Sequence, residues 1–312
     1  MAPTGNSPLN LVLGVASVGD TSVDPLARFD SPDEVNGILN TFAARGYHQL
    51  DTARVYSPHA PGTSEPRLGA VAAGDRFIID TKVESRRPGD HTKAKVLKGI
   101  DISLEALKVK QINIEYLHKP DRATRFEEPC EAMDQAHKEG KIKYWGISSY
   151  TAKSVYQGQY NAVVRGGEKE LFPVLRKNGI AFYAYSVAAG GFFAGNAKKA
   201  EAGGRYDQSH RVGSMYAEFY LKPSIMAAAD NAVAVASKYG ISGHAAALRW
   251  AACHSVLEKA HGDSIILGVS SSKQLDSNID AIEQGPLPED VVAAFEDMYG
   301  KIDKENEVSY HM

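Results

Sequence analysis

The chain has 312 residues, of which 43% are hydrophobic and 23% are charged, which is typical of a folded globular protein. The length suits one large α/β barrel or two small domains, and because no low-complexity linker interrupts it, we expect a single domain over residues 1–312. With 35 basic and 38 acidic side chains the net charge is -3, which argues against nucleic acid or an anionic membrane as a partner. The ligand to expect is a small molecule.

The N-terminal segment does not have the pattern of a secretory signal peptide. Residues 1–10 lack a basic region, and the apolar run 11–16 is too short for a signal peptide. The longest apolar stretch, 180–195, is interrupted by polar residues and glycines and is shorter than a membrane span. Cys130 and Cys253 lie in segments of helical period, so we expect two buried free thiols in the cytoplasm and no membrane partner.

Short apolar runs alternate along the chain with longer segments of helical period. The clearest helix start is at Ser31, where Glu34 completes a capping box and Pro32 takes the first helical position. Further helices are predicted over 93–107, 127–139, 169–178, 224–239, 242–260, 272–284 and 289–302. Strands are predicted over 11–17, 47–52, 77–83, 112–118, 142–148, 155–160, 180–186 and 264–269. This alternation predicts a (β/α)8 TIM barrel, although a doubly wound parallel sheet fits the same periodicity.

Four polar residues follow predicted strands at their carboxyl ends: Asp51, Tyr56, Lys82 and His118. Taken singly, each has an ordinary structural explanation as a turn residue, a core ring, a solvated cation or a hydrogen-bonded interior imidazole. In a barrel, however, the carboxyl ends of the strands meet at one mouth, where catalytic residues lie. Their joint placement therefore makes them candidate catalytic residues.

Such a set can donate a proton to a carbonyl oxygen while hydride reaches the carbonyl carbon. A lysine ammonium beside Tyr56 is expected to lower the pKa of the phenol, and a carboxylate would keep that lysine charged and in place. His118, if neutral, can donate to the substrate oxygen and orient it. The sequence contains no GxGxxG after a strand, no Walker A loop, no HExxH and no CxxC, which disfavours Rossmann, P-loop, zincin and thiol-redox functions.

Segments spread from about Leu11 to Ala293 resemble the aldo-keto reductases, and in particular the aflatoxin-aldehyde reductase type and its fungal relatives. They include LDTARVY, IDTK, IEYLHKPD, GKIKYWGISSY, VYQGQYN and HGDSIILGVSSSKQLDSNI. The resemblance implies a (β/α)8 barrel that uses NADPH without a Rossmann fold. It also places the catalytic tetrad of the family on Asp51, Tyr56, Lys82 and His118.

The same resemblance implies a cofactor-binding set. The nicotinamide end would be held by Ser148, Ser149 and Gln157, with the ring stacked on Tyr185; the family has Ser-Asn where this chain has Ser148-Ser149. The pyrophosphate would meet the backbone of Ser186, Ala188 and Gly190. The adenosine phosphate end would lie at Gly268, Ser270, Gln274 and Asn278.

Two departures from the family stand out. Relatives carry arginines where this chain has Ala217 and Phe219, so recognition of the 2'-phosphate would rest on Arg205, Arg211 or Lys198. Relatives also place a helix between two strands that are here separated only by residues 151–154. Four residues span at most about 14 Å, less than an ordinary strand of about 17–20 Å, so we expect a missing crossover helix and a displaced Gln157. A true deletion and a mis-predicted intron would both explain the gap.

The leading hypothesis is an NADPH-dependent carbonyl reductase, a monomer or homodimer. Its substrate would be a reactive aldehyde or dialdehyde, or a ketone of fungal secondary metabolism. One alternative is a non-enzymatic cofactor-binding accessory protein that resembles potassium-channel β subunits. A barrel that has lost both roles is a third hypothesis, because Gln157 directly follows the missing crossover.

Overall fold

A closed barrel of eight parallel strands forms the centre of the molecule, in the order β1 to β8, and β8 pairs with β1. The computed structural model describes residues 5–148, 155–199 and 201–310. The strands are β1 (Asn10–Gly14), β2 (Gln49–Asp51), β3 (Ile78–Lys82), β4 (Ile112–Leu117), β5 (Ile142–Ser148), β6 (Val155–Gln159), β7 (Ala181–Tyr185) and β8 (Ser264–Gly268). All eight predicted strands are present, and closure confirms the TIM barrel over the doubly wound sheet.

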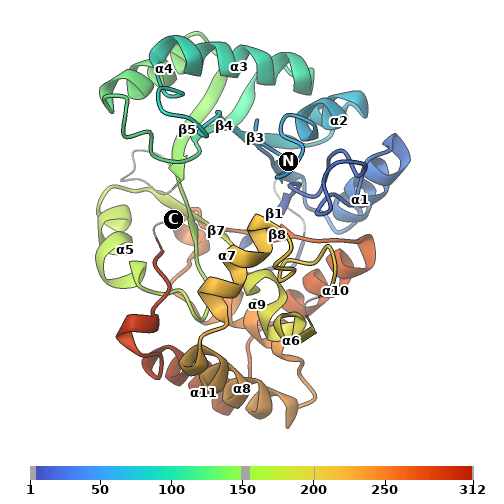
Figure 1. Cartoon of the computed structure of the whole chain (residues 1–312), viewed down its shortest axis with the longest axis vertical. Coiled ribbons are helices and arrows are strands. Elements are labelled where there is room, and N and C mark those ends of the chain that lie inside the picture. The colour runs from blue at the N-terminus through green and yellow to red at the C-terminus, as the bar shows by residue number, and fades with distance from the viewer. Residues whose placement is uncertain (1–4, 149–154, 200, 311–312) are drawn as a thin grey trace.

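Helices surround the barrel (Figure 1). They are α1 (Pro32–Ala44), α2 (Ser64–Ala70), α3 (Lys93–Leu107), α4 (Glu127–Lys138), α5 (Gly167–Lys177), α6 (Asn196–Lys199), α7 (Arg211–Tyr220), α8 (Pro223–Ser237), α9 (Gly243–Cys253), α10 (Ser272–Glu283) and α11 (Glu289–Gly300). The predicted helix over 242–260 is shorter than expected and ends at Cys253. Cys130 and Cys253 do not form a disulfide bond, and both are half-buried rather than fully buried as expected.

Helix α1 begins as the sequence predicts. The Ser31 hydroxyl accepts a hydrogen bond from the Glu34 backbone, and the Glu34 carboxylate accepts one from the Ser31 backbone at 3.0 Å. Four apolar side chains at helical spacing on the inner face are then buried: Val35, Ile38, Leu39 and Phe42. The capping box thus fixes the start of the helix, and the apolar stripe holds it against the barrel.

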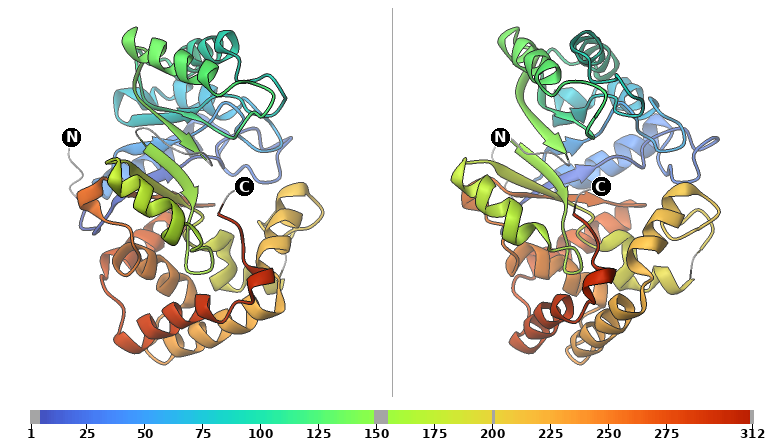
Figure 2. Two further views of the ribbon diagram at one scale, coloured as in Figure 1. Left: turned by 90° about the vertical axis from the view of Figure 1, so that its left-hand side faces the viewer. Right: turned by 60° about the vertical axis from the view of Figure 1, so that its left-hand side comes forward.

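Strands β5 and β6 pair directly although only six residues join them. Gly146 lies opposite Val155 and Ser148 lies opposite Gln157, so β6 starts only two positions behind the end of β5. The steric argument used the length of a whole strand, whereas these two strands pair over only three residues, which shortens the distance that their connection must span. The described residues contain no helix between β5 and β6 in the chain. The two strands lie between helices α4 and α5 (Figure 2). Residues 149–154 lie outside the described residues.

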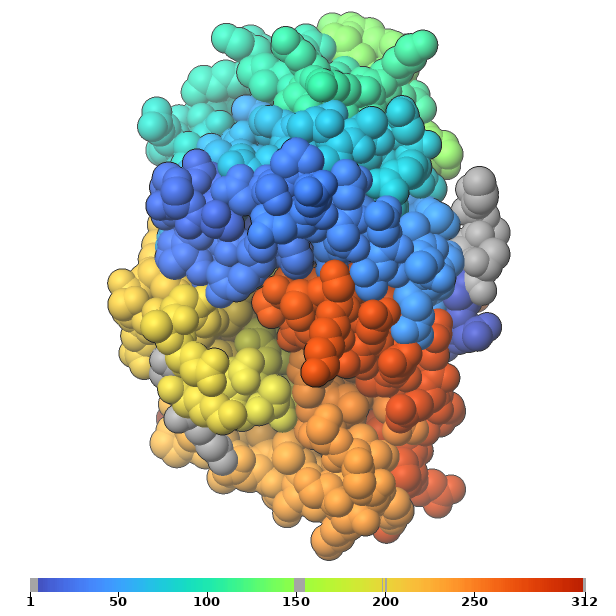
Figure 3. Space-filling view, turned by 90° about the vertical axis from the view of Figure 1, so that its right-hand side faces the viewer, coloured from blue at the N-terminus to red at the C-terminus, as the bar shows by residue number. Residues whose placement is uncertain are grey.

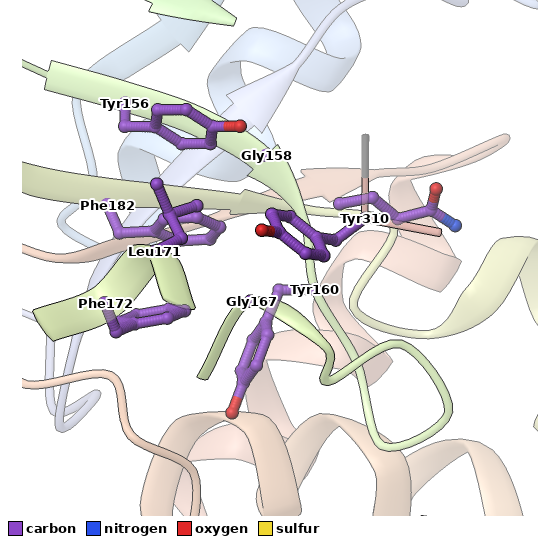
Figure 4. A pocket seen from close by; sticks show the side chains of 9 residues that line it. Tyr156, Gly158, Tyr160, Gly167, Leu171, Phe172, Phe182 and Tyr310 are labelled. Carbon is purple, nitrogen blue, oxygen red and sulfur yellow. The ribbon is translucent and has the colours of Figure 1, made fainter. Parts of the chain in front are cut away.

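A narrow crevice lies between the outer face of β6 and helix α5 (Figure 4). Tyr156 of β6 stacks on Phe182 at 5.5 Å between ring centroids, and Tyr310 near the C-terminus donates a hydrogen bond to Glu170 at 3.1 Å. The Tyr156 hydroxyl is buried and has no hydrogen-bond partner among the described residues. The C-terminal segment therefore covers part of the face that a crossover helix would occupy, and one buried polar group there is left unsatisfied.

Candidate active site

A buried ion pair lies at the mouth of the barrel. Asp51 ends β2 and Lys82 ends β3, and the Lys82 ammonium donates to Asp51 Oδ2 at 2.7 Å and to the Thr52 carbonyl oxygen at 2.7 Å. Lys82 is fully buried. Burial is the largest single influence and opposes the charge on Lys82, but Asp51 and Tyr56 together outweigh it and raise the pKa of the ammonium. The lysine therefore stays charged inside the protein.

Tyr56 and His118 complete the cluster. Lys82 Nζ lies 4.9 Å from the centroid of the Tyr56 ring, and the His118 ring stands edge-on to Tyr56 with centroids 5.7 Å apart. The four side chains that the sequence placed at strand ends are thus brought together.

The sequence expectation for the Tyr56 phenol needs correction. Lys82 does act to lower its pKa, but burial is the larger effect and the net pKa is raised. Burial, followed by the charge of Lys82, holds the pKa of His118 well below its usual value. At neutral pH the phenol is therefore protonated and the imidazole is neutral, and both can donate a hydrogen bond.

Gln157 contacts the cluster through Asp51. Its side-chain nitrogen donates to Asp51 Oδ1 at 2.7 Å, so both oxygens of Asp51 are occupied, one by Lys82 and one by Gln157. Across the short β5–β6 connection, Gln157 pairs in register with the buried Ser148. Ser149, also expected near the nicotinamide, lies outside the described residues.

The turn after β7 carries the next group of predicted cofactor residues. Tyr185 ends β7, Ser186 has a φ of 55°, and Ala188 precedes Gly190, which has a φ of 63°. The Ser186 hydroxyl lies 3.0 Å from the hydroxyl of Tyr216 on α7. A Cβ at Gly190 would lie 2.5 Å from the same ring, so only glycine fits there. Helix α7 thus fixes this turn in a compact conformation.

The turn from β8 into α10 carries the third group. Gly268 is exposed, and a Cβ placed on it would have no atom within 4 Å, so a ligand can approach the backbone closely. The Gln274 side-chain oxygen accepts from the Ser270 backbone at 2.8 Å, and Asn278 Oδ1 lies 2.8 Å from His244 Nε2. The open backbone at the start of a twelve-residue helix fits a phosphate group.

Two arginines of the predicted phosphate set lie at the same mouth. The Arg205 guanidinium lies 5.9 Å from the Tyr216 ring centroid, and its charge contributes to lowering the pKa of Tyr56. Arg211 is the first residue of α7. The pKa of Lys119 is lowered first by burial and second by the charge of Arg211. The side chain of Lys198 lies outside the described residues.

Sequence reasoning missed a contact between two histidines over the mouth. His59 follows Tyr56 by three residues, and its ring lies 5.4 Å from that of His210, which caps α7. His59 Nε2 is buried with no partner among the described residues. Arg28 donates to the Gly203 carbonyl oxygen at 2.6 Å, so the loop before α7 lies against the N-terminal loops (Figure 3). The nearness of His59 to Tyr56 in the sequence indicates only that His59 lies close to the cluster, and no local signal indicates its contact with His210.

Across the described ranges, no helix is both long and apolar enough to cross a membrane. Over the same ranges, no group of three or more His, Cys, Asp and Glu side chains could hold a metal ion.

Comparison with known proteins gives a consistent result. The model of the family described as "Aldo/keto reductase family" matches residues 10–299. The chain is 38% identical to "Oxidoreductase sirO" of Leptosphaeria maculans, over 84% of this chain and 84% of that protein. It is 36% identical to "Aflatoxin B1 aldehyde reductase member 2" of Homo sapiens, over 91% of this chain and 84% of that protein.

A solved structure, the glycerol dehydrogenase AKR11B4 from Gluconobacter oxydans, superposes with a TM-score of 0.72. It covers 92% of this chain and 90% of its own, at 23% identity, and so supports the fold alone. The family match and the two relatives carry the assignment further, and on them the chain belongs to the aldo/keto reductase family of oxidoreductases.

Proposed function

We propose that this protein reduces an aldehyde or a ketone to an alcohol with NADPH, and that Tyr56 is the general acid. The observation that carries the proposal is the buried Lys82 ammonium, which lies between the Asp51 carboxylate at 2.7 Å and the Tyr56 ring at 4.9 Å. A phenol is a weak acid at neutral pH, so it needs a neighbouring positive charge to stabilise the phenolate that remains after proton transfer.

Each residue of the cluster then has a defined task. The neutral His118 imidazole donates to the carbonyl oxygen and orients it toward Tyr56. The Tyr56 hydroxyl gives its proton to that oxygen as negative charge develops there, and Lys82 stabilises the resulting phenolate. Asp51 holds Lys82 in place, and Gln157 in turn holds Asp51. NADPH, when bound, supplies the hydride that reaches the carbonyl carbon.

The residues present fit this cofactor. The flat ring of Tyr185 at the end of β7 suits stacking against a nicotinamide, and the exposed backbone at Gly268 suits a phosphate. Arg205 and Arg211 supply positive charge at the mouth, which favours NADPH over NADH. One N–H of the Gln157 side chain is donated to Asp51, which leaves its second N–H and its oxygen for the carboxamide.

The substrate class follows from the relatives. One is named an aflatoxin aldehyde reductase and another is a fungal oxidoreductase, so we propose reactive aldehydes, dialdehydes or ketones of secondary metabolism as substrates. Substrate pockets in such barrels are built from loops after the strands. We include the loops that carry His59 and His210, whose rings are in contact, in that pocket.

The test is to incubate the purified protein with NADPH and a panel of aldehydes, following loss of NADPH absorbance together with formation of the alcohol. Equal amounts of NADPH lost and alcohol formed would support a reductase. If NADPH binds tightly but no alcohol forms with any aldehyde or ketone, the protein is a cofactor-binding accessory protein instead. If NADPH does not bind, the barrel has lost both roles.

A further inference from the structure

A second carboxyl group lies in the barrel interior below the catalytic cluster. Asp80 precedes Lys82 by two residues on β3, so the two side chains lie on the same face of that strand. In the strand pairing, Asp80 lies directly opposite Asp51 of β2. Asp80 is fully buried. It therefore occupies the layer next to the Asp51–Lys82 pair, with no role in the proton transfer described above.

The hydrogen bonds of Asp80 come from neutral groups. Gln49 Nε2 donates to Oδ2 at 2.7 Å and Asn113 Nδ2 donates to Oδ1 at 2.7 Å. Among the residues that the structure describes, no lysine, arginine or histidine forms an ion pair with it. Neutral amide donors stabilise the ionised form of a buried carboxyl less than a neighbouring cation does. Both protonation states of Asp80 are therefore accessible.

The hydrogen-bond network around Asp80 extends toward the amino-terminal end of the barrel. Asn10 donates to the Gln49 oxygen at 2.9 Å, and Gln49 donates to the Tyr183 hydroxyl at 3.3 Å. Asn10, Gln49, Asn113 and Tyr183 are all half-buried, so this polar network is open to water at its outer edge. One layer of half-buried polar side chains therefore separates Asp80 from water at this end of the barrel.

We propose that Asp80 is a positioning residue that tunes the catalytic cluster through its charge: when ionised it strengthens the hold on the Lys82 ammonium and makes Tyr56 a weaker acid. This inference rests on the proposed reductase function. No contact between Asp80 and a substrate is required, because the effect is electrostatic and passes across one layer of the barrel.

The charged and titratable groups around Asp80 are Asp51 on β2, Lys82 on its own strand, Tyr116 on β4 and Tyr183 on β7. Burial raises the pKa of Asp80 to about 7; the amide donors and Lys82 lower it, and Asp51 raises it. Asp80 is thus protonated on the acid side of neutrality and ionised on the alkaline side. Reduction should accordingly slow as pH rises through about 7, before Tyr56 itself ionises.

The kinetic test compares kcat for carbonyl reduction against pH in the wild type and in Asp80→Asn, with exposed Asp75→Asn as the matched control. We expect a step of about three- to tenfold near neutral pH in the wild type and in Asp75→Asn, and no step in Asp80→Asn. A step of equal size in Asp80→Asn, or none in the wild type, would overturn the proposal.

A second variant guards against misfolding of Asp80→Asn. Removal of an amide donor in Asn113→Ala should raise the pKa of Asp80 and move the step to higher pH. An unmoved step in a folded Asn113→Ala protein would count against Asp80 as its source.

A measurement without turnover separates this proposal from the proposed function. Infrared difference spectra recorded against pH should show one carboxyl band that titrates near neutrality in the wild type and is absent from Asp80→Asn. If no carbonyl is reduced but this band is present, the proposed function fails and the titration of Asp80 stands, whereas its link to catalysis is refuted. If reduction is normal and the band is missing, only the Asp80 proposal fails.

Discussion

Lys82 Nζ lies 2.7 Å from Asp51 Oδ2 in a setting where neither side chain is more than 5% exposed. Such a pair gains stability only if its remaining donors and acceptors are also satisfied. The Thr52 carbonyl and the Gln157 amide satisfy them on either side. What the pair provides is a fixed positive charge beside Tyr56, and most of the predictions below depend on that charge.

Replacement of Lys82 should show how strongly that charge acts on Tyr56. In Lys82→Met the buried phenol loses the neighbouring cation that lowers its pKa, so carbonyl reduction should fall by at least about 10²-fold. The pH–rate profile of the residual activity should shift its alkaline limb to higher pH. An active Lys82→Met enzyme with the wild-type profile would show that Lys82 does not tune Tyr56.

Cofactor preference should follow the arginines at the mouth. We expect NADPH to quench the intrinsic fluorescence of the protein and to bind more tightly than NADH. Arg205→Ala and Arg211→Ala should each weaken NADPH binding by about tenfold and leave NADH binding nearly unchanged. Each substitution removes a partner of the 2'-phosphate, a group that NADH lacks. Equal affinity of the wild type for both cofactors would contradict the role given to these arginines.

Glu115 on the outer face of β4 should reduce stability at neutral pH. It is fully buried, neither carboxyl oxygen has a partner among the described residues, and burial followed by the nearby Glu65 raises its pKa well above 4.5. A raised pKa in the folded state favours the protonated form. The resulting stability is present below the unfolded pKa and is lost as pH rises through the folded one.

Glu115→Met should therefore raise the free energy of unfolding by about 1–3 kcal/mol at neutral pH and by less at about pH 5. Glu65→Gln is the contrasting variant, because Glu65 accepts from Arg54 and Thr81, each at 2.7 Å, and its loss should destabilise the protein. Urea unfolding at the two pH values measures both. A destabilised Glu115→Met protein would mean that this carboxyl has a partner that the structure does not describe.

The short connection between β5 and β6 leads to a prediction about the gene as well as the protein. A transcript with an extra in-frame segment of about 15–20 residues between the codons for Tyr150 and Val155 would supply a crossover helix. Insertion of such a segment should raise the melting temperature and the solubility, because it would cover the face where the Tyr156 hydroxyl is buried without a described partner.

The contrary outcome is equally clear. A transcript that matches the present sequence, together with a soluble protein that reduces aldehydes at ordinary rates, would show that the barrel functions without this helix. The pairing of Gly146 with Val155 allows this outcome, because it leaves only a short distance for the connection between β5 and β6 to span.

Much of the fold was accessible from the sequence because its signals are local. The capping box at Ser31 and the eight β-branched and aromatic runs each carry their own periodicity. Helix α2 was missed because Pro66 and Gly69 interrupt its short pattern, and it is held by the burial of Glu65 and Leu68. The end of α9 at Cys253 was also missed, since helical periodicity continued past it.

The candidate site was accessible in part for the same reason. The positions of Asp51, Tyr56, Lys82 and His118 at strand ends depend only on where strands stop. Their electrostatics depend on neighbours distant in the chain, so the dominance of burial over Lys82 at Tyr56 could not be predicted. The hydrogen bond from Gln157 to Asp51 spans 106 residues and likewise has no local signal.

Single-turnover reduction in Tyr56→Phe tests the central claim most directly. The variant keeps the ring against His118 and removes only the hydroxyl, so cofactor binding should be little changed. Enzyme preloaded with NADPH is mixed with excess aldehyde, and the rate of NADPH loss is compared with the wild type. The account predicts a rate at least about 10²-fold lower in Tyr56→Phe at unchanged NADPH affinity. A wild-type rate in that variant would contradict the assignment of Tyr56 as the proton donor.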